Sequence, residues 1–392
     1  MTDAATGSLP RFEFATAARI LFGAGIVREL GATAAGYGKR VLLASGVPIE
    51  TVEPAVESLR AAGAEVELWP VTKEPDLEGI LAAVRRAVEG KSEVIVGLGG
   101  GSAMDTAKAA AALAVNPGDP LDYLEVVGKG LPLERPGLPC IAVPTTAGTG
   151  AEVTRNAVIA VPERKVKVSL RNPWLLPRAA LIDPELTLGL PPAVTAATGM
   201  DALTQVLEPY VCSRANPLTD GFCREGMRRA GRSLRAAFAE GGLAAREDMC
   251  LASLCGGLAL ANAGLGAVHG FAAPLGGLLA APHGAVCARL LPVVMHANIR
   301  ALRARDPEAP SLQRYGEIAA LLTGRENAAP EEGADWAQRL AEDLRIPPLR
   351  SWGLSESDFD AVADNARRAS SMKANPVALS PEELMEILRE AQ

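Results

Sequence analysis

The first half of the chain alternates short apolar runs with segments of helical periodicity, and this alternation restricts the possible folds most strongly. The runs typical of strands are KRVLLAS, AEVELWPV, SEVIVGLGGGS and LPCIAVPTT. The helical segments between them are IETVEPAVESLRAAG, DLEGILAAVRRAVEG and AMDTAKAAAALAV. Strands that alternate with helices in this way predict a parallel α/β sheet.

The character of the chain changes near residue 190. Residues 166–192 are extended and proline-rich, and almost every later segment is rich in Ala, Leu, Arg and Glu with a helical period. A chain of 392 residues also suits two domains better than one core. We therefore predict an α/β domain over residues 1–190 and an all-helical domain over residues 191–392.

Charge and hydropathy argue against a nucleic-acid partner, a signal peptide and a membrane span. The formal net charge is -7 and no block of Lys and Arg stands out, so the sequence lacks the electrostatic signature of a nucleic-acid binder. The polar start MTDAATGSLPRFEF does not have the form of a signal peptide. No apolar run reaches the length of about 18 residues that a membrane span needs.

The six cysteines are scattered and form no CxxC pair or metal-knuckle spacing. Scattered thiols in a chain of this size indicate a reducing cytoplasm. Their expected role is that of small buried hydrophobic residues.

A glycine turn follows the third predicted strand. Gly99, Gly100 and Gly101 lie between that strand and a helix, where a backbone without Cβ atoms can approach a ligand closely. The N–H groups and dipole of the first helical turn favour a phosphate, and Ser102 can cap the helix or bond a phosphate oxygen. The alternative is a plain tight turn whose glycines serve only packing.

A second loop makes nucleotide binding the better interpretation. PTTAGTGAEVT, residues 144–154, follows another predicted strand and carries Thr145, Thr146 and Thr149. Loops at the carboxyl ends of parallel strands face one crevice, where open α/β sheets bind their ligands.

Four side chains in the predicted helical domain are candidates for a metal site. Asp201 and Gln205 in TGMDALTQVLEPY are four residues apart and so share one helix face. His269 and His283 would lie about 21 Å apart on a straight helix, but glycine and proline breaks between them allow the chain to fold back. The alternative is that His269 and His283 are ordinary half-buried histidines. We interpret His296 as a histidine of that ordinary kind.

Taken together, the motifs resemble those of iron-containing (group III) alcohol dehydrogenases. GGGSAMDTAK, PTTAGTGAEVT, LIDPELTLGLPP, TGMDALTQVLEPY and VHGFAAPLGGLLAAPHG occur in that family's order and spacing. The resemblance runs from RILFGAG to NPVALSPEELMEIL, nearly the whole chain. It implies a dehydroquinate synthase-like fold: an α/β dinucleotide-binding domain, an all-α domain, and a nicotinamide cofactor in the cleft between them.

The resemblance also assigns roles to individual residues. Those implied to surround the pyrophosphate are Gly100, Gly101, Ser102 and Asp105. Those implied to line the nucleotide and nicotinamide are Thr145, Thr146 and Thr149, while Lys167 would reach the ribose. The four metal positions fall on Asp201, Gln205, His269 and His283, of which Asp201, His269 and His283 are also the expected catalytic residues.

The chain departs from the family at three positions. Gln205 stands where the family usually has a third histidine, which changes the donors to two oxygens and two nitrogens. This harder set weakens the binding of Zn²⁺ and Fe²⁺ somewhat and admits Mn²⁺. Ala273 replaces a non-ligating histidine found in many members, so a proton relay through that ring is unavailable. Gly46 stands where NAD-specific members often have Asp, so the resemblance leaves NAD or NADP open.

The expected function is therefore NAD(P)-dependent alcohol dehydrogenation or the reverse reduction of an aldehyde or ketone. Fe²⁺, or Zn²⁺ or Mn²⁺, would act as a Lewis acid on the carbonyl oxygen while hydride moves from the nicotinamide. We expect a small alcohol or aldehyde as substrate, and the resemblance suggests a homodimer. Small apolar residues near the histidines are interpreted as packing residues: Ala272, Ala273, Leu275 and Leu279.

The sequence leaves three other functions open. A metal-free enzyme similar to maleylacetate reductases would need an anion clamp in its pocket. A lyase similar to dehydroquinate synthase would need a glutamate ligand and a pocket dense in Lys and Arg, which TGMDALTQVLEPY does not supply. A nucleotide-binding protein without catalysis is the third.

Overall fold

The computed structural model describes residues 11–125, 127–164 and 166–392, and in these residues six strands form one parallel sheet in the order β1-β8-β5-β4-β2-β3. In sheet order the strands are β1 (Ile20–Phe22), β8 (Ala179–Ile182), β5 (Cys140–Pro144), β4 (Val94–Gly99), β2 (Arg40–Ser45) and β3 (Glu65–Pro70). The predicted parallel α/β sheet is confirmed. Residues 1–10, where the sequence predicts no signal peptide, lie outside the described residues.

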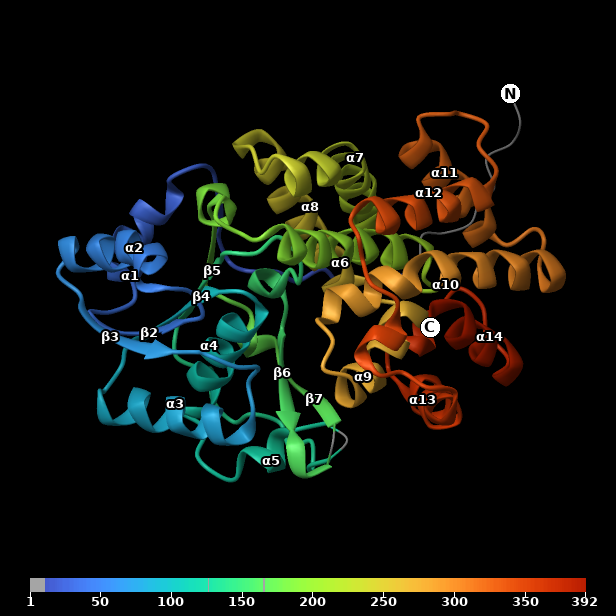
Figure 1. Cartoon of the computed structure of the whole chain (residues 1–392). Helices are drawn as coiled ribbons and strands as arrows, with labels where there is room; N and C mark the ends of the chain where they lie inside the picture. Colours follow the sequence, from blue (N-terminus) through green and yellow to red (C-terminus); the bar gives the residue numbers. More distant parts are fainter. Residues whose placement is uncertain (1–10, 126, 165) are drawn as a thin grey trace.

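Helices cover both faces of this sheet, because successive side chains of each strand point to opposite faces. Val41 and Leu43 of β2 pack with α1 (Leu30–Ala35) and α2 (Ile49–Ala61). Leu42 and Ala44 pack on the other side with α3 (Leu77–Glu89) and α4 (Gly101–Leu113). This layered part lies on the left of Figure 1.

A separate antiparallel hairpin, β6 (Asn156–Val161) and β7 (Val166–Arg171), lies beyond α4, near the short helix α5 (Pro120–Tyr123). The sequence analysis predicted an extended segment for β7 but no β6. The buried ammonium of Lys108 on α4 joins the two parts, since it donates hydrogen bonds to the carbonyl oxygens of Ala151 and Asn156.

From Pro192 onward the described chain is helical, as predicted. The helices are α6 (Pro192–Val211), α7 (Pro217–Ala239), α8 (Leu243–Asn262), α9 (Ala267–Leu278), α10 (His283–Arg305), α11 (Pro310–Thr323), α12 (Pro330–Asp343), α13 (Phe359–Arg368) and α14 (Pro381–Ala391). The division near residue 190 stays a prediction, although the last strand of the sheet ends at Ile182 and α6 begins ten residues later.

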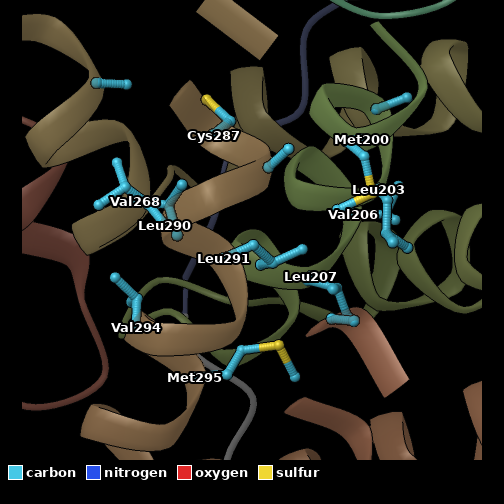
Figure 2. Close-up of a cluster of buried hydrophobic side chains, with 14 of the residues drawn as sticks. Met200, Leu203, Val206, Leu207, Val268, Cys287, Leu290, Leu291, Val294 and Met295 are labelled. Atoms are coloured by element: carbon cyan, nitrogen blue, oxygen red, sulfur yellow. The ribbon is translucent and has the colours of Figure 1, made fainter. Parts of the chain in front are cut away.

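Helix α6 lies at the centre of the helical part. Its apolar side chains, among them Leu203 and Leu207, pack against Leu291 and Val294 of α10 (Figure 2). Helix α10 has the length and mean hydropathy (1.3) of a membrane span, but 83% of that apolar window is buried inside the protein. Helix α10 is therefore a core helix of this protein.

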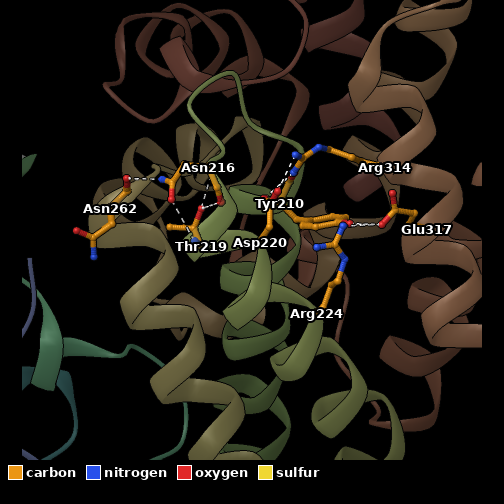
Figure 3. A network of polar contacts seen from close by, with 8 residues as sticks. All are labelled: Tyr210, Asn216, Thr219, Asp220, Arg224, Asn262, Arg314 and Glu317. Atoms are coloured by element: carbon orange, nitrogen blue, oxygen red, sulfur yellow. Dashed lines mark hydrogen bonds and ion pairs between the residues drawn. The ribbon is translucent and has the colours of Figure 1, made fainter. Parts of the chain in front are cut away.

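Polar contacts hold the C-terminal end of α6 against α7 and α11 (Figure 3). The guanidinium groups of Arg224 and Arg314 stack on the Tyr210 ring at 5.0 and 4.9 Å from its centroid. Arg314 also makes a two-pronged ion pair with Asp220, at 2.6 and 2.7 Å, and the Tyr210 hydroxyl donates to Glu317. These contacts keep α6 in a defined position along its axis.

Candidate active site

A cleft of about 910 Å³ opens at the carboxyl ends of β2, β4 and β5. It lies where the strand order reverses between β2 and β4, the position at which open α/β sheets bind their ligands. The sequence-predicted residues that line it are Gly100, Gly101, Ser102, Thr145 and Thr146, together with Gly46. Thr149 lies beside this group, because a Cβ atom on Gly101 would come within 3.1 Å of its side chain.

Glycine is required at the end of β4. Gly99 has φ 150°, and a Cβ atom there would lie 2.8 Å from the Cβ of Ala103 and 3.1 Å from the amide nitrogen of Gly46. Helix α4 then begins at Gly101 with Gly100 as its N-cap and no side-chain capping bond. Ser102 lies inside the helix and does not cap it, so of its two expected roles only the bond to a phosphate oxygen stays a prediction. The uncapped N–H groups of this first turn suit a phosphate.

Two further predicted cofactor residues are held by protein contacts. Asp105 forms an ion pair with Lys108 at 2.9 Å and accepts a hydrogen bond from the Val158 amide at 2.9 Å. Lys167 on β7 pairs with Glu74 at 2.6 Å. Their roles toward a pyrophosphate and a ribose stay predictions.

The loop of residues 144–154 lies against the helix that carries the second group of candidate residues, α6. A Cβ atom on Gly148 would meet the side chain of Thr198 at 2.8 Å, and Thr198 is three residues before Asp201 on α6. The cleft and the predicted metal site are therefore joined by direct packing of loop on helix.

The structure brings the predicted metal ligands together from three helices. Asp201 and Gln205 are buried on α6, His269 on α9, and His283 is the first residue of α10. The Oδ1 atom of Asp201 lies 3.4 Å from Nε2 of His269 and 3.8 Å from Nε2 of His283. The two rings are 5.4 Å apart between centroids, so the predicted fold-back between α9 and α10 is confirmed.

Close helix contact at two glycines allows this convergence. A Cβ atom on Gly284 would lie 2.1 Å from the carbonyl oxygen of Ala197 and 3.2 Å from the Cβ of Asp201. A Cβ atom on Gly270 would lie 3.0 Å from the side chain of Met372. Each glycine directly follows one of the two histidines, so larger residues there would push the rings out of place.

Glu208 fixes the orientation of His269, and the sequence analysis missed it. Its Oε2 atom lies 2.6 Å from Nδ1 of His269, while its Oε1 atom accepts the Val268 N–H at 2.7 Å. Asn375 accepts the neighbouring Ala267 N–H at 3.0 Å. These bonds satisfy first-turn amides of α9, which has no side-chain cap of its own. They also leave Nε2 of His269 as the ring nitrogen that faces Asp201.

Cys287 is the second residue that the sequence analysis missed. All six cysteines are buried and free, as expected of small hydrophobic residues. However, the Sγ atom of Cys287 lies 3.6 Å from Nε2 of His283 and 3.9 Å from Nε2 of His269. Its spacing of one helical turn after His283 was the available signal.

The electrostatics of the group favour added positive charge. Burial alone would raise the pKa of the Asp201 carboxyl, but His283 and His269 outweigh it and hold that pKa below its ordinary value. The charge of Cys287 raises the pKa of His283, and Asp201 raises it further. A field that stabilises protonated imidazoles also stabilises a divalent cation among them.

Unsatisfied acceptors support a cation at the same place. Asp201 Oδ1 and Gln205 Oε1 are buried and accept no hydrogen bond from the described residues. Buried oxygens without partners are rare and call for an explanation. A cation among carboxylate, amide and imidazole donors supplies one, so this set of residues fits a divalent metal ion.

The remaining residues that the sequence singles out lie outside the metal cluster. Ala272, Leu275 and Leu279 are buried in the core of the helical part, which confirms their interpretation as packing residues. Ala273 is exposed. His296 pairs with Asp335 at 3.0 Å on the far part of α10 and takes no part in the cluster.

Two family models match the chain almost end to end. The model described as "Iron-containing alcohol dehydrogenase" matches residues 17–184. The model described as "Fe-containing alcohol dehydrogenase family, C-terminal" matches residues 195–392.

Individual proteins agree with this match. The chain is 38% identical over 336 residues to alcohol dehydrogenase 4 of Saccharomyces cerevisiae (strain YJM789), and these residues cover 85% of each chain. It is 38% identical over 375 residues to 1,3-propanediol dehydrogenase of Klebsiella pneumoniae, covering 90% of this chain and 92% of that protein.

Solved structures superpose on almost the whole chain. A crystal structure of a 1,3-propanediol oxidoreductase superposes with a TM-score of 0.89 at 34% identity, covering 98% of this chain and 100% of the other. The NAD⁺ complex of sulfoacetaldehyde reductase from Bifidobacterium kashiwanohense superposes with a TM-score of 0.84 at 27% identity, covering 97% and 99%. The chain therefore belongs to the iron-containing alcohol dehydrogenase family and is an alcohol dehydrogenase.

Proposed function

We propose that the enzyme interconverts a small alcohol and its aldehyde or ketone with a nicotinamide dinucleotide and one divalent metal ion. The observation that carries the proposal is a pair of buried oxygens that accept no hydrogen bond from the part of the chain that the structure describes, Asp201 Oδ1 and Gln205 Oε1, beside the imidazoles of His269 and His283. A cation would satisfy both oxygens at once.

The residues that would hold the metal are Asp201, Gln205, His269 and His283. Gln205 gives a neutral oxygen where a histidine would give a neutral nitrogen, so the charge of the set is unchanged. When bound, Fe²⁺, Zn²⁺ or Mn²⁺ supplies Lewis-acid stabilisation for the negative charge that develops on the substrate oxygen.

The nucleotide cofactor would occupy the cleft at the ends of β2, β4 and β5. The first turn of α4 suits its pyrophosphate, and the threonines after β5 suit the part nearer to α6. The cofactor supplies the hydride chemistry. A structural relative carries NAD⁺. At Gly46 no carboxylate opposes a 2′-phosphate, so we propose that both NAD and NADP are accepted.

The chain's own residues bind, orient and exclude water around the reacting carbonyl. The side chain of His283 is 44% exposed, so the group of metal donors is open to solvent at this residue. The side chains of Asp201 and His269 are buried. Glu208 keeps a proton on Nδ1 of His269 and so keeps Nε2 available. With Ala273 in place of a relay ring, the substrate proton would leave through water or the ribose hydroxyls.

The proposed substrate is a modest uncharged alcohol or aldehyde. Beside the Asp201 carboxylate lie donors proposed for the metal, with the imidazole nitrogens of His269 and His283 at 3.4 and 3.8 Å. A homodimer in the cytoplasm is a further proposal, based on the family resemblance and the free thiols.

The test is aldehyde reduction before and after removal of metal. Protein purified without oxygen or chelator should oxidise NADH or NADPH with aldehydes of two to four carbons. Chelation should abolish this activity, and Fe²⁺, Zn²⁺ or Mn²⁺ should restore it. Asp201→Asn should be inactive, whereas Asp343→Asn, on the exposed side of α12, should behave as the native protein. Activity that survives complete removal of metal would overturn the metal-dependent mechanism.

A further inference from the structure

The thiol of Cys287 lies beside the site and is a potential metal donor that the proposed set does not use. Cys287 follows His283 by one turn of α10, and its side chain is fully buried. Donor atoms of Asp201, His269, His283 and Cys287 all lie within 4.8 Å of one another.

The distances within this group match the edges of a tetrahedron around one metal ion. Metal bonds of about 2.0–2.2 Å to oxygen and nitrogen and about 2.3 Å to sulfur imply edges of about 3.3–3.6 Å between ligand atoms. The edges from Asp201 Oδ1 to the two ring nitrogens are 3.4 and 3.8 Å. Those from Cys287 Sγ to the same nitrogens are 3.6 and 3.9 Å. Shifts of a few tenths of an ångström would close this shell.

The orientation of the rings agrees with that arrangement. Nδ1 of His269 is bound to Glu208 at 2.6 Å, so the lone pair of that ring lies on Nε2, toward both Asp201 and Cys287. Nε2 of His283 also faces both of them. A thiol that only filled space in the core would not need two imidazole nitrogens directed at its sulfur.

We propose that Cys287 binds the metal ion as a thiolate, together with Asp201, His269 and His283. This inference rests on the proposed function, because it requires a metal at this site. Carboxylate and thiolate then carry two negative charges against a divalent cation, with two neutral imidazoles. Gln205 stays a weaker donor in the same set, as in the proposed function, and the softness of the thiolate shifts the preference toward Zn²⁺ and away from Mn²⁺.

Spectroscopy of the metal-loaded protein tests the proposal without relying on activity. Cobalt(II) bound by a thiolate has a sulfur-to-metal charge-transfer band in the near ultraviolet, and zinc absorption-edge fine structure resolves sulfur at about 2.3 Å from lighter atoms at about 2.0 Å. Native protein, Cys287→Ser and Cys223→Ser would be loaded with Co²⁺ or Zn²⁺. Cys223 is an equally buried thiol on α7 and serves as the matched control.

We expect the band and the sulfur distance in native protein and Cys223→Ser, and neither in Cys287→Ser. Zinc affinity should fall in Cys287→Ser by about 10- to 100-fold or more, the loss that even an outer-shell change causes. In Cys287→Ala with Gln205→His, zinc should bind again without a sulfur signal.

Two results would overturn the proposal. One metal ion per chain with no sulfur signal in native protein would remove Cys287 from the ligands and leave the proposed function intact. No metal bound by native protein would overturn both proposals together. Since native protein alone decides both points, failure of a variant to fold does not affect the test.

Discussion

Oε2 of Glu208 lies 2.6 Å from Nδ1 of His269. Glu208 follows Asp201 by two turns of the same helix, α6. One helix thus carries a proposed metal ligand and the group that orients a second ligand from another helix. A carboxylate behind a ligating histidine fixes its tautomer and raises its basicity.

Replacing this carboxylate should weaken metal binding without unfolding the protein. We expect Glu208→Gln to lower metal affinity by about 10- to 100-fold, measured by competition with a chelator of known affinity. Glu317→Gln removes a carboxylate from the outer network of α6 and should leave the affinity unchanged. Equal affinities of Glu208→Gln and native protein would contradict the role assigned to Glu208.

Gly46 should set the tolerance for the 2′-phosphate of NADP. An Asp side chain there would place a negative charge in the nucleotide cleft, where charges about 4 Å apart repel by a few kcal/mol. Gly46→Asp should therefore lower kcat/KM for NADPH by at least about tenfold relative to NADH. Gly46→Asn has the same shape without the charge and should not change that ratio. A similar ratio in both variants would mean that this position does not contact the phosphate.

The close approach of α6 and α10 should make Gly284 intolerant of any side chain. Gly284→Ala would place a methyl group 2.1 Å from the Ala197 carbonyl oxygen, and overpacking of this kind costs about 1–3 kcal/mol. Gly221→Ala on α7 meets open space and should be neutral or stabilising by up to about 1 kcal/mol. Urea unfolding of both variants tests this contrast, which would fail if Gly284→Ala were as stable as native protein.

Asp248 should contribute stability that depends on pH. Hydrogen bonds from Arg232 hold the pKa of this buried carboxyl below its ordinary value, against the effect of burial. A carboxyl with a lowered folded pKa stabilises the protein above its unfolded pKa of about 3.9, and this contribution disappears as pH falls through the folded pKa.

Asp248→Asn should therefore lower the free energy of unfolding by about 1.5–3 kcal/mol at pH 7, and its deficit should shrink below about pH 4. The exposed pair of Arg235 and Asp343 provides the control, since Asp343→Asn should cost less than about 1 kcal/mol. A deficit for Asp248→Asn that stayed constant down to pH 3 would contradict the assignment.

Strands β5, β4, β2 and β3 could be predicted from sequence because they are short apolar runs between helical segments. Strand β1 was not predicted, and β8 was predicted only as part of an extended segment, because ILF and AALI are too short to give a strand pattern. The convergence of His269 and His283 could also be predicted, since glycine and proline between them prevent one straight helix. Strand β6 was missed because NAVIAV lies in a segment whose pairing with β7 depends on its support by α4 and Lys108.

Glu208 and Cys287 were missed for a different reason. Both carry a readable signal, since Glu208 shares a helix face with Asp201 and Cys287 shares one with His283. However, periodicity does not say which face of α6 meets which face of α10. That depends on the contact at Gly284, which is a property of tertiary packing.

The most direct test of the account is the position of metal in a crystal of the active enzyme, located by anomalous scattering at the edge of the bound metal. We predict one peak per chain, at about 2.0–2.2 Å from Asp201 Oδ1, His269 Nε2 and His283 Nε2. Active crystals with no peak between these three atoms, or with the metal elsewhere, would contradict the central claim that α6, α9 and α10 converge to hold the ion.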